Sequence, residues 1–127
     1  MRNSKFHLYS VAVSVIITGT SNSAYAEFLT ITEFGQKNLG STAAYSLTCE
    51  KESLSPVGGA NQILKAANSS LAPKDALAVR RQFQISTHEK KIFSPSRNEW
   101  FDFVIDKQNC DEITKTIPII LDAMKPR

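Results

Sequence analysis

The first 26 residues have the pattern of a secretory signal peptide, and this pattern decides how the rest of the sequence is interpreted. Arg2 and Lys5 give a basic start, an apolar run covers residues 8–17, and Ala24-Tyr25-Ala26 places small residues at the two positions that a signal peptidase recognises. We expect cleavage between Ala26 and Glu27. The sequence therefore predicts a periplasmic or secreted protein in which residues 27–127 form a single small globular domain.

Two other interpretations of this segment are an uncleaved membrane anchor and a helix of a cytosolic protein. A transmembrane helix needs about 20 apolar residues, whereas this run contains ten and includes Ser10 and Ser14. A retained amphipathic helix would carry charges along one face, and none occurs between Lys5 and Glu27. We therefore favour the signal peptide and expect no transmembrane segment after its cleavage.

The charge of the predicted domain differs from that of the whole chain. The net charge of +3 includes Arg2 and Lys5 of the leader. Residues 27–127 contain 13 Lys and Arg against 12 Asp and Glu. Nucleic-acid-binding domains are usually strongly basic, so this near-neutral balance gives no reason to expect nucleic acid as a partner.

The predicted domain contains two cysteines, Cys49 and Cys110. In an oxidising compartment two cysteines have one intramolecular pairing, so a Cys49–Cys110 disulfide is expected. Closing a loop of about 60 residues stabilises the folded state by roughly 4 kcal/mol in the chain-entropy model. Two free thiols or an intermolecular bridge are the alternatives. A redox-active pair is not indicated, because C-x-x-C spacing is absent.

Apolar residues at helical spacing predict a first helix over residues 30–53. Thr30 is its predicted N-cap, and Glu33 completes a capping box. Gly35 and Gly40 count against this helix, since each costs about 1 kcal/mol relative to Ala in a helix interior. After a turn rich in Pro and Gly at residues 55–59, the pattern predicts a second helix over residues 61–71.

A third helix is predicted to begin at Pro73, which suits the first helical turn. Residues 81–105 then fit either helix or strand. Residues 83–87 alternate as a strand would, although the third helix can also continue to Lys91. Residues 101–105 favour a short strand, but Ser96 and Glu99 would also cap a helix there.

The last segment predicts an amphipathic helix that begins at an Asn109–Glu112 capping pair. Its apolar face is formed by Cys110, Ile113, Ile117, Ile120, Leu121 and Met124. Pro118 removes a backbone donor, so we expect a kink there or a restart after Thr116. The predicted fold class is mainly α: a small helical bundle, with or without a short two-stranded β element, and one disulfide.

Motifs that would indicate catalysis or cofactor binding are absent from the sequence. G-x-S-x-G, S-x-x-K and nucleotide-binding glycine motifs do not occur. Structural zinc takes four Cys or His ligands, whereas residues 27–127 contain His88 and two cysteines that are expected to pair. We expect no metal site and no cofactor.

A minimal hydrolase remains an alternative. Asp102 and Asp106 could act as the carboxylate pair of a glycosidase, or His88 as a base. The simpler interpretation is that the two carboxylates keep an aromatic segment soluble and that His88 is solvated.

Two features indicate binding. The first is a basic cluster with five positive charges within 18 residues, formed by Arg80, Arg81, Lys90, Lys91 and Arg97. Such a cluster attracts anionic partners, although it can also be an ordinary solvated face. The second is Trp100, which lies beside the cluster in a segment whose other aromatic residues we expect in the core.

The resulting functional hypothesis is a non-catalytic exported protein that acts by contact. An inhibitor, an immunity-type protein or an envelope accessory protein would fit, with another envelope protein or an anionic envelope component as its partner. The alternatives are the minimal hydrolase and a periplasmic chaperone for acid stress.

Overall fold

Four helices and two short antiparallel strand pairs make up the described residues, 17–20 and 28–125, of the computed structural model. The elements are β1 (Ile17–Thr20), β2 (Leu29–Ile31), α2 (Glu33–Lys51), α3 (Gly59–Ser70), α4 (Pro73–Glu89), β3 (Lys91–Ser94), β4 (Glu99–Asp102) and α5 (Lys107–Ala123). The predicted fold class, a small helical bundle with a two-stranded β element and one disulfide, is confirmed. The predicted cleavage site after Ala26 lies outside the described residues.

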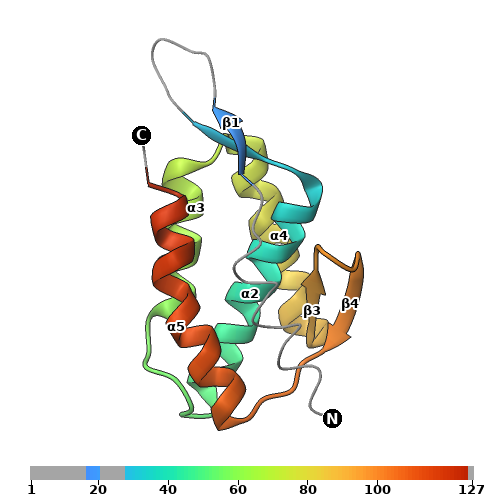
Figure 1. Cartoon of the computed structure of the whole chain (residues 1–127), viewed down its shortest axis with the longest axis vertical. Helices are drawn as coiled ribbons and strands as arrows, with labels where there is room; N and C mark the ends of the chain where they lie inside the picture. The colour runs from blue at the N-terminus through green and yellow to red at the C-terminus, as the bar shows by residue number, and fades with distance from the viewer. Residues whose placement is uncertain (1–16, 21–27, 126–127) are drawn as a thin grey trace.

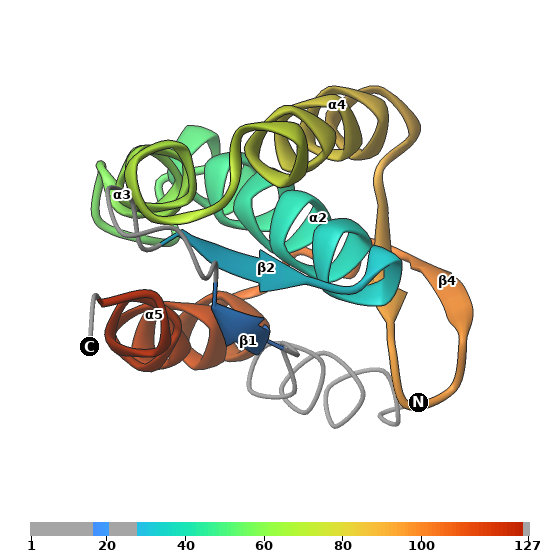
Figure 2. The same ribbon diagram turned by 90° about the horizontal axis from the view of Figure 1, so that it is seen from above.

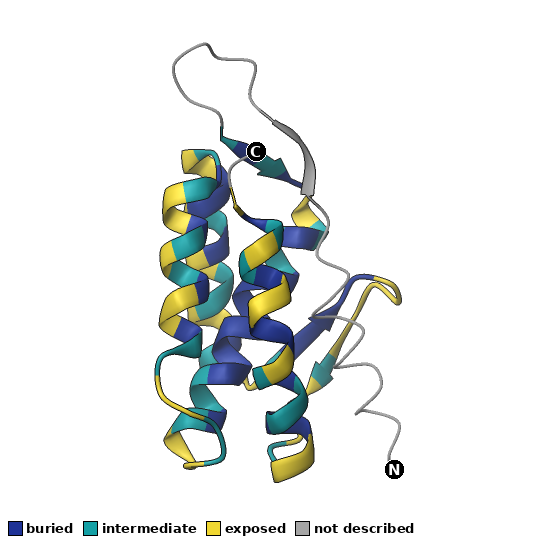
Figure 3. Cartoon of the chain, turned by 60° about the vertical axis from the view of Figure 1, so that its left-hand side comes forward, coloured by how far each residue is buried: buried dark blue, intermediate teal, exposed yellow. Residues whose placement is uncertain are grey.

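Helix α2 is the central element of the fold. Residues 38–46 of this helix are all buried, and α3, α4, α5 and β3 all contact it. In Figure 1, α4 runs in the same direction as α2, whereas α3 and α5 run in the opposite direction. Figure 2 shows α2 between α4 on one side and α5 on the other. Buried residues are accordingly concentrated along its middle (Figure 3).

The start of α2 corrects one sequence prediction. The N-cap is Thr32 rather than Thr30, and its hydroxyl accepts a hydrogen bond from the backbone N–H of Gly35 at 3.1 Å. Thr30 belongs to β2, which pairs with β1. The backbone N–H of Ile31 donates to the buried Asp75 carboxylate at 3.2 Å. These contacts hold the chain extended up to Thr32 and delay the helix by two residues.

Gly40 explains how α2 and α4 pack so closely. A Cβ atom at this position would lie 2.6 Å from the Cβ of Gln82 and 2.6 Å from the carbonyl oxygen of Val79. No side chain fits such a gap. The glycine that counted against a helix in the sequence is therefore required by the tertiary contact.

The structure resolves the ambiguous residues 81–105. Helix α4 continues to Glu89 and ends at Lys90, which has a left-handed backbone with φ of 59°. A strand over 83–87 was therefore a wrong alternative, because Val79, Phe83 and Ser86 pack at helical spacing toward the interior. A turn at residues 95–98 replaces the Ser96-capped alternative and joins β3 to β4.

Polar side chains of α2 attach this β3–β4 hairpin to the helix. Phe93 pairs with Trp100 in the hairpin. The N–H of Phe93 donates to Ser41 Oγ at 3.0 Å, and its carbonyl oxygen accepts from Asn38 Nδ2 at 3.3 Å. These bonds satisfy the edge of β3 that faces away from β4. Asn38 and Ser41 of α2 thus bond the free edge of β3, as a neighbouring strand would.

Helix α5 begins earlier than the sequence predicts. Its N-cap is Asp106, whose carboxylate accepts from the N–H of Asn109 at 2.8 Å, so Asn109 lies inside the first turn. The helix continues through Pro118 to Ala123, and the expected restart after Thr116 does not occur. The exposed position of Pro118 accommodates its ring at the surface of the bundle.

The predicted Cys49–Cys110 disulfide is confirmed and joins the end of α2 to the start of α5. Beside it, the carbonyl oxygen of Val104 accepts hydrogen bonds from Tyr45 Oη and from Asn109 Nδ2, the latter at 2.9 Å. Both cysteines are fully buried. We call these five residues the disulfide junction.

Candidate binding surface

Helix α4 presents one continuous face to solvent. Its exposed side chains recur mainly at spacings of three and four residues, and together they cover about half of the helix circumference. This face, which we call the α4 outer face, consists of Lys74, Leu77, Arg80, Arg81, Gln84, Ile85, His88 and Glu89. The opposite side of α4 contacts α2.

Large apolar side chains are exposed on and beside the α4 outer face. Leu77 is 56% exposed, Ile85 is 43% exposed, and Trp100 on the adjacent β4 is 36% exposed. These are three of the six large hydrophobic residues exposed among residues 28–125. Exposed apolar groups that cluster, rather than occur singly, mark interaction sites.

A shallow pocket joins α4 to the hairpin. It has a volume of about 360 Å³ and is lined by Ile85, Ser86, Glu89, Lys91 and Trp100. The Trp100 ring packs against the buried Phe93 ring at 5.1 Å between centroids, so Trp100 is anchored from below. Ser86 Oγ is buried and has no hydrogen-bond partner among the described residues. We call this the Trp100 pocket.

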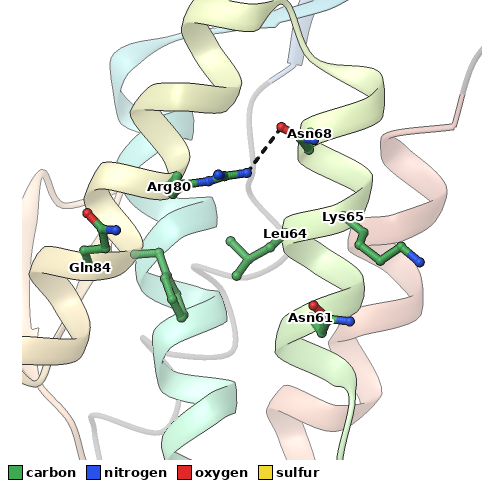
Figure 4. Close-up of a pocket in the computed structure, with 7 residues that line it drawn as sticks. Asn61, Leu64, Lys65, Asn68, Arg80 and Gln84 are labelled. Carbon is green, nitrogen blue, oxygen red and sulfur yellow. Dashed lines mark hydrogen bonds between the residues drawn. The ribbon is translucent and has the colours of Figure 1, made fainter.

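A second hollow, which we call the α3–α4 groove, lies on the other side of α4. It has a volume of about 320 Å³ and is lined by Asn61, Leu64, Lys65, Asn68, Arg80, Phe83 and Gln84. Figure 4 shows Arg80 reaching from α4 toward Asn68 on α3, and its Nη2 donates to Asn68 Oδ1 at 3.3 Å. Leu64 lies between the two helices, whereas Lys65 points away from Arg80. No carboxylate lines this groove.

Charge is distributed unevenly over the helices. Helices α3 and α4 contain the cations Lys65, Lys74, Arg80 and Arg81 and the acids Asp75 and Glu89. The Asp75 carboxylate is buried, and it accepts from the N–H of Ile31 and from Gln36 Nε2. Glu89 is therefore the only exposed acid on these two helices. On α5, by contrast, acids outnumber Lys.

The structure separates the basic cluster that the sequence predicted. Arg80 and Arg81 lie midway along α4, while Lys90 and Lys91 lie where α4 meets the hairpin. Lys91 Nζ is 2.9 Å from Asp102 Oδ1, and this hydrogen-bonded carboxylate raises the pKa of Lys91. The separation follows from the chain reversal at Lys90: Lys91 lies at the Trp100 pocket near the end of α4, and Arg97 lies in the hairpin turn.

The remaining predicted residues, Arg97 and Trp100, lie on the hairpin. Arg97 is in the hairpin turn, where its Nε is 4.0 Å from Glu99 Oε1, and Trp100 borders the pocket described above. Of the predicted set, Arg80 and Arg81 thus lie on the α4 outer face, and Lys91 and Trp100 line the pocket beside it. Leu77 and Ile85 were missed by the sequence reasoning, although two apolar residues on the polar side of α4 were visible in its helical pattern.

The residues considered for hydrolysis have other contacts. Asp102 binds Lys91, Asp106 caps α5, and His88 is exposed near the end of α4. In the part of the chain with described side chains, no three His, Cys, Asp or Glu residues are grouped so that they could hold a metal ion. None of the described helices is both long and apolar enough to cross a membrane.

Comparisons with protein-family models, with curated proteins and with solved structures found no significant match to this chain. The α4 outer face and the hollows beside it are therefore the basis for assigning a function.

Proposed function

We propose that this is an exported, non-catalytic protein that acts by binding another protein through the α4 outer face and the adjoining Trp100 pocket. An inhibitor, an immunity-type protein or an accessory protein of the cell envelope would act in this way. The observation that carries the proposal is the exposure of Ile85 and Trp100 at one hollow, with Leu77, Arg80 and Arg81 exposed along the same helix.

The expected compartment supports this proposal. Structural disulfides persist in oxidising compartments, and Cys49–Cys110 joins two helices of this fold. The signal-peptide pattern of residues 1–26 is consistent with the same destination. Leu29 and Ile31 also contact α4 and its preceding loop independently of β1, so β2 retains partners if the leader is removed.

The composition of the surface fits a protein interface. Trp, Tyr and Arg residues carry much of the binding energy at such interfaces, and this surface contains Trp100, Arg80 and Arg81. Leu77 and Ile85 are eight residues apart and therefore about 12 Å apart along the helix axis. A partner that covers both would also cover Arg81, which lies between them.

A comparative pull-down tests the proposal. The native periplasm or culture medium is passed over the immobilised wild-type protein, the variant Leu77→Ser/Ile85→Ser and the control Ile119→Ser. Ile119 on α5 is 49% exposed and so matches Ile85 closely. We expect one enriched protein with the wild type and the control, and its loss with the α4 variant. Equal capture by both variants contradicts the proposed surface, and the absence of any enriched protein contradicts a function by contact.

A further inference from the structure

We infer that the α4 outer face is shaped for an acidic, amphipathic protein segment that crosses α4. One carboxylate of this segment binds Arg80 in the α3–α4 groove, and an apolar side chain enters the Trp100 pocket. This inference rests on the proposed function and adds the chemistry of the partner.

In the α3–α4 groove, the Arg80 guanidinium group has donors that can bind an anion. A guanidinium group has five N–H donors in a planar fork, and Arg80 donates to Asn68 at 3.3 Å. Its other donors remain available for a carboxylate, which binds Arg through short charge-assisted hydrogen bonds. Among the described residues, no acidic side chain lines the groove to compete with the partner.

The Trp100 side provides the apolar contact. Trp100 and Ile85 are partly exposed, and Trp100 packs on the buried Phe93. The indole ring therefore has a fixed support and loses little freedom when a partner covers it. Aromatic residues held in this way are frequent centres of interface energy.

The positions of the two sites determine the geometry of the partner. Arg80 and Ile85 are separated by five residues, which turns their side chains by about 140° around the helix. The two hollows thus lie on opposite flanks of α4. A segment that reaches both crosses the helix over Arg81 and Gln84, two exposed residues that lie between Arg80 and Ile85, and a second carboxylate fits beside Arg81.

Charge favours a protein partner over a lipid surface. Binding to anionic membranes generally involves four to eight clustered Lys and Arg residues. Here the Trp100 pocket includes Glu89 beside Lys91, and Lys91 is already paired with Asp102. The two cations Arg80 and Arg81 are enough to bind the carboxylates of an acidic polypeptide. Such a polypeptide also supplies apolar side chains for the Trp100 pocket, which a lipid headgroup lacks.

A titration followed by NMR tests the inference directly. The full chain is expressed with ¹⁵N labelling, and the purified protein is titrated with a helical Glu- and Leu-containing peptide whose Leu residues form one stripe. One control peptide replaces every Glu by Lys, and another replaces every Leu by Ser. Phosphatidylglycerol vesicles provide the lipid arm. We expect shifts at Arg80, Arg81, Ile85 and the Trp100 indole with the Glu–Leu peptide only.

The matched variants are Arg80→Gln and Lys115→Gln, the latter on exposed α5. We expect Arg80→Gln to weaken peptide binding about tenfold, as for a close charge pair at an interface, while Lys115→Gln binds like the wild type. Equal binding of the Lys peptide, equal loss in both variants, or vesicle-induced shifts at the same residues overturn the inference.

The outcomes also separate this inference from the proposed function. If the peptide does not bind but Leu77→Ser/Ile85→Ser still abolishes capture of the natural partner, the surface is correct and the acidic partner chemistry is wrong. A second copy of this chain could instead bind the α4 outer face through its α5. A doubled mass in sedimentation would show this, and the inference would likewise be overturned. Loss of both peptide binding and specific capture contradicts the two proposals together.

Discussion

The disulfide junction and the α4 outer face differ in how their chemical groups are used. At the junction the cysteines, Tyr45 and Asn109 are buried, bonded to one another or to the Val104 carbonyl, and inaccessible to a partner. On the α4 outer face, Leu77 and Ile85 are exposed on the same side as the cations. This contrast indicates that the junction stabilises the fold and that the outer face is available for binding.

Of the changes considered at the two regions, removing the disulfide should lower the stability of the fold most. In the variant Cys49→Ala/Cys110→Ala we expect a loss of roughly 4 kcal/mol in the free energy of unfolding, because the unfolded chain regains the freedom of a loop of about 60 residues. Denaturant titration of oxidised wild type, reduced wild type and variant measures it. Near-equal midpoints for all three would show that the junction does not depend on the bond.

Gly40→Ala tests the packing that positions α4. The new Cβ would lie 2.6 Å from Val79 O, so we expect destabilisation of about 1–3 kcal/mol from overpacking. The sign of the change in the free energy of unfolding is decisive, because Gly→Ala in a helix without this contact stabilises the protein by up to about 1 kcal/mol. Thermal unfolding measures the change, and a raised midpoint would contradict the close α2–α4 contact.

Tyr45→Phe removes one hydrogen bond of the junction. We expect a loss of about 1 kcal/mol in the free energy of unfolding at neutral pH, the usual net value for such a bond. The Val104 carbonyl retains its bond from Asn109, which limits the loss. A value near zero would mean that Tyr45 acts only by filling space.

Wild type and Tyr45→Phe should also differ in how their free energy of unfolding depends on pH. Burial raises the pKa of Tyr45 above its usual range, whereas in the unfolded chain the phenol ionises near pH 10. The contribution of the neutral phenol to stability is therefore fully present below about pH 10 and is lost as the pH rises toward the folded-state pKa. Above pH 10 we expect wild-type stability to fall more steeply than that of Tyr45→Phe in denaturant titrations.

Changes on the α4 outer face should have the smallest effect on stability. For Leu77→Ser and Arg81→Gln we expect shifts within about 0.5 kcal/mol, as is usual for surface substitutions. Partner capture should nevertheless decrease. A loss of stability as large as that of Gly40→Ala would place these side chains in the packed structure and remove the contrast between the two regions.

The sequence was sufficient for the features that depend on local pattern. The mainly helical fold and the start of α4 at Pro73 were predicted correctly because helical spacing is a local property. The disulfide joins residues 61 apart, and it was predicted correctly because two cysteines allow only one intramolecular pairing. The errors at Thr30 and Asn109 arose where a distant side chain or a neighbouring aspartate determined the helix start. Asp75 lies 44 residues from Ile31 along the chain, so no local rule could reveal their bond.

The candidate surface was only partly predictable. Arg80, Arg81 and Trp100 were identified from charge and aromatic content. Closeness in sequence also included Arg97, which lies in the hairpin turn, and Lys91, which lines the Trp100 pocket but is paired with Asp102. The importance of Leu77 and Ile85 depends on which side of α4 faces α2. That orientation is set by Gly40 and Val79, through a tertiary contact that periodicity alone does not specify.

We propose that the α4 outer face contacts a partner protein in the native compartment. The most direct measurement is photo-crosslinking in living cells, with a photoreactive amino acid placed at Arg81 on α4 or at Lys115 on α5, both exposed positions. We predict one discrete crosslinked product from position 81, absent from position 115 and abolished by the added change Ile85→Ser. Crosslinking from position 115 alone, or identical products from both positions, would contradict the account.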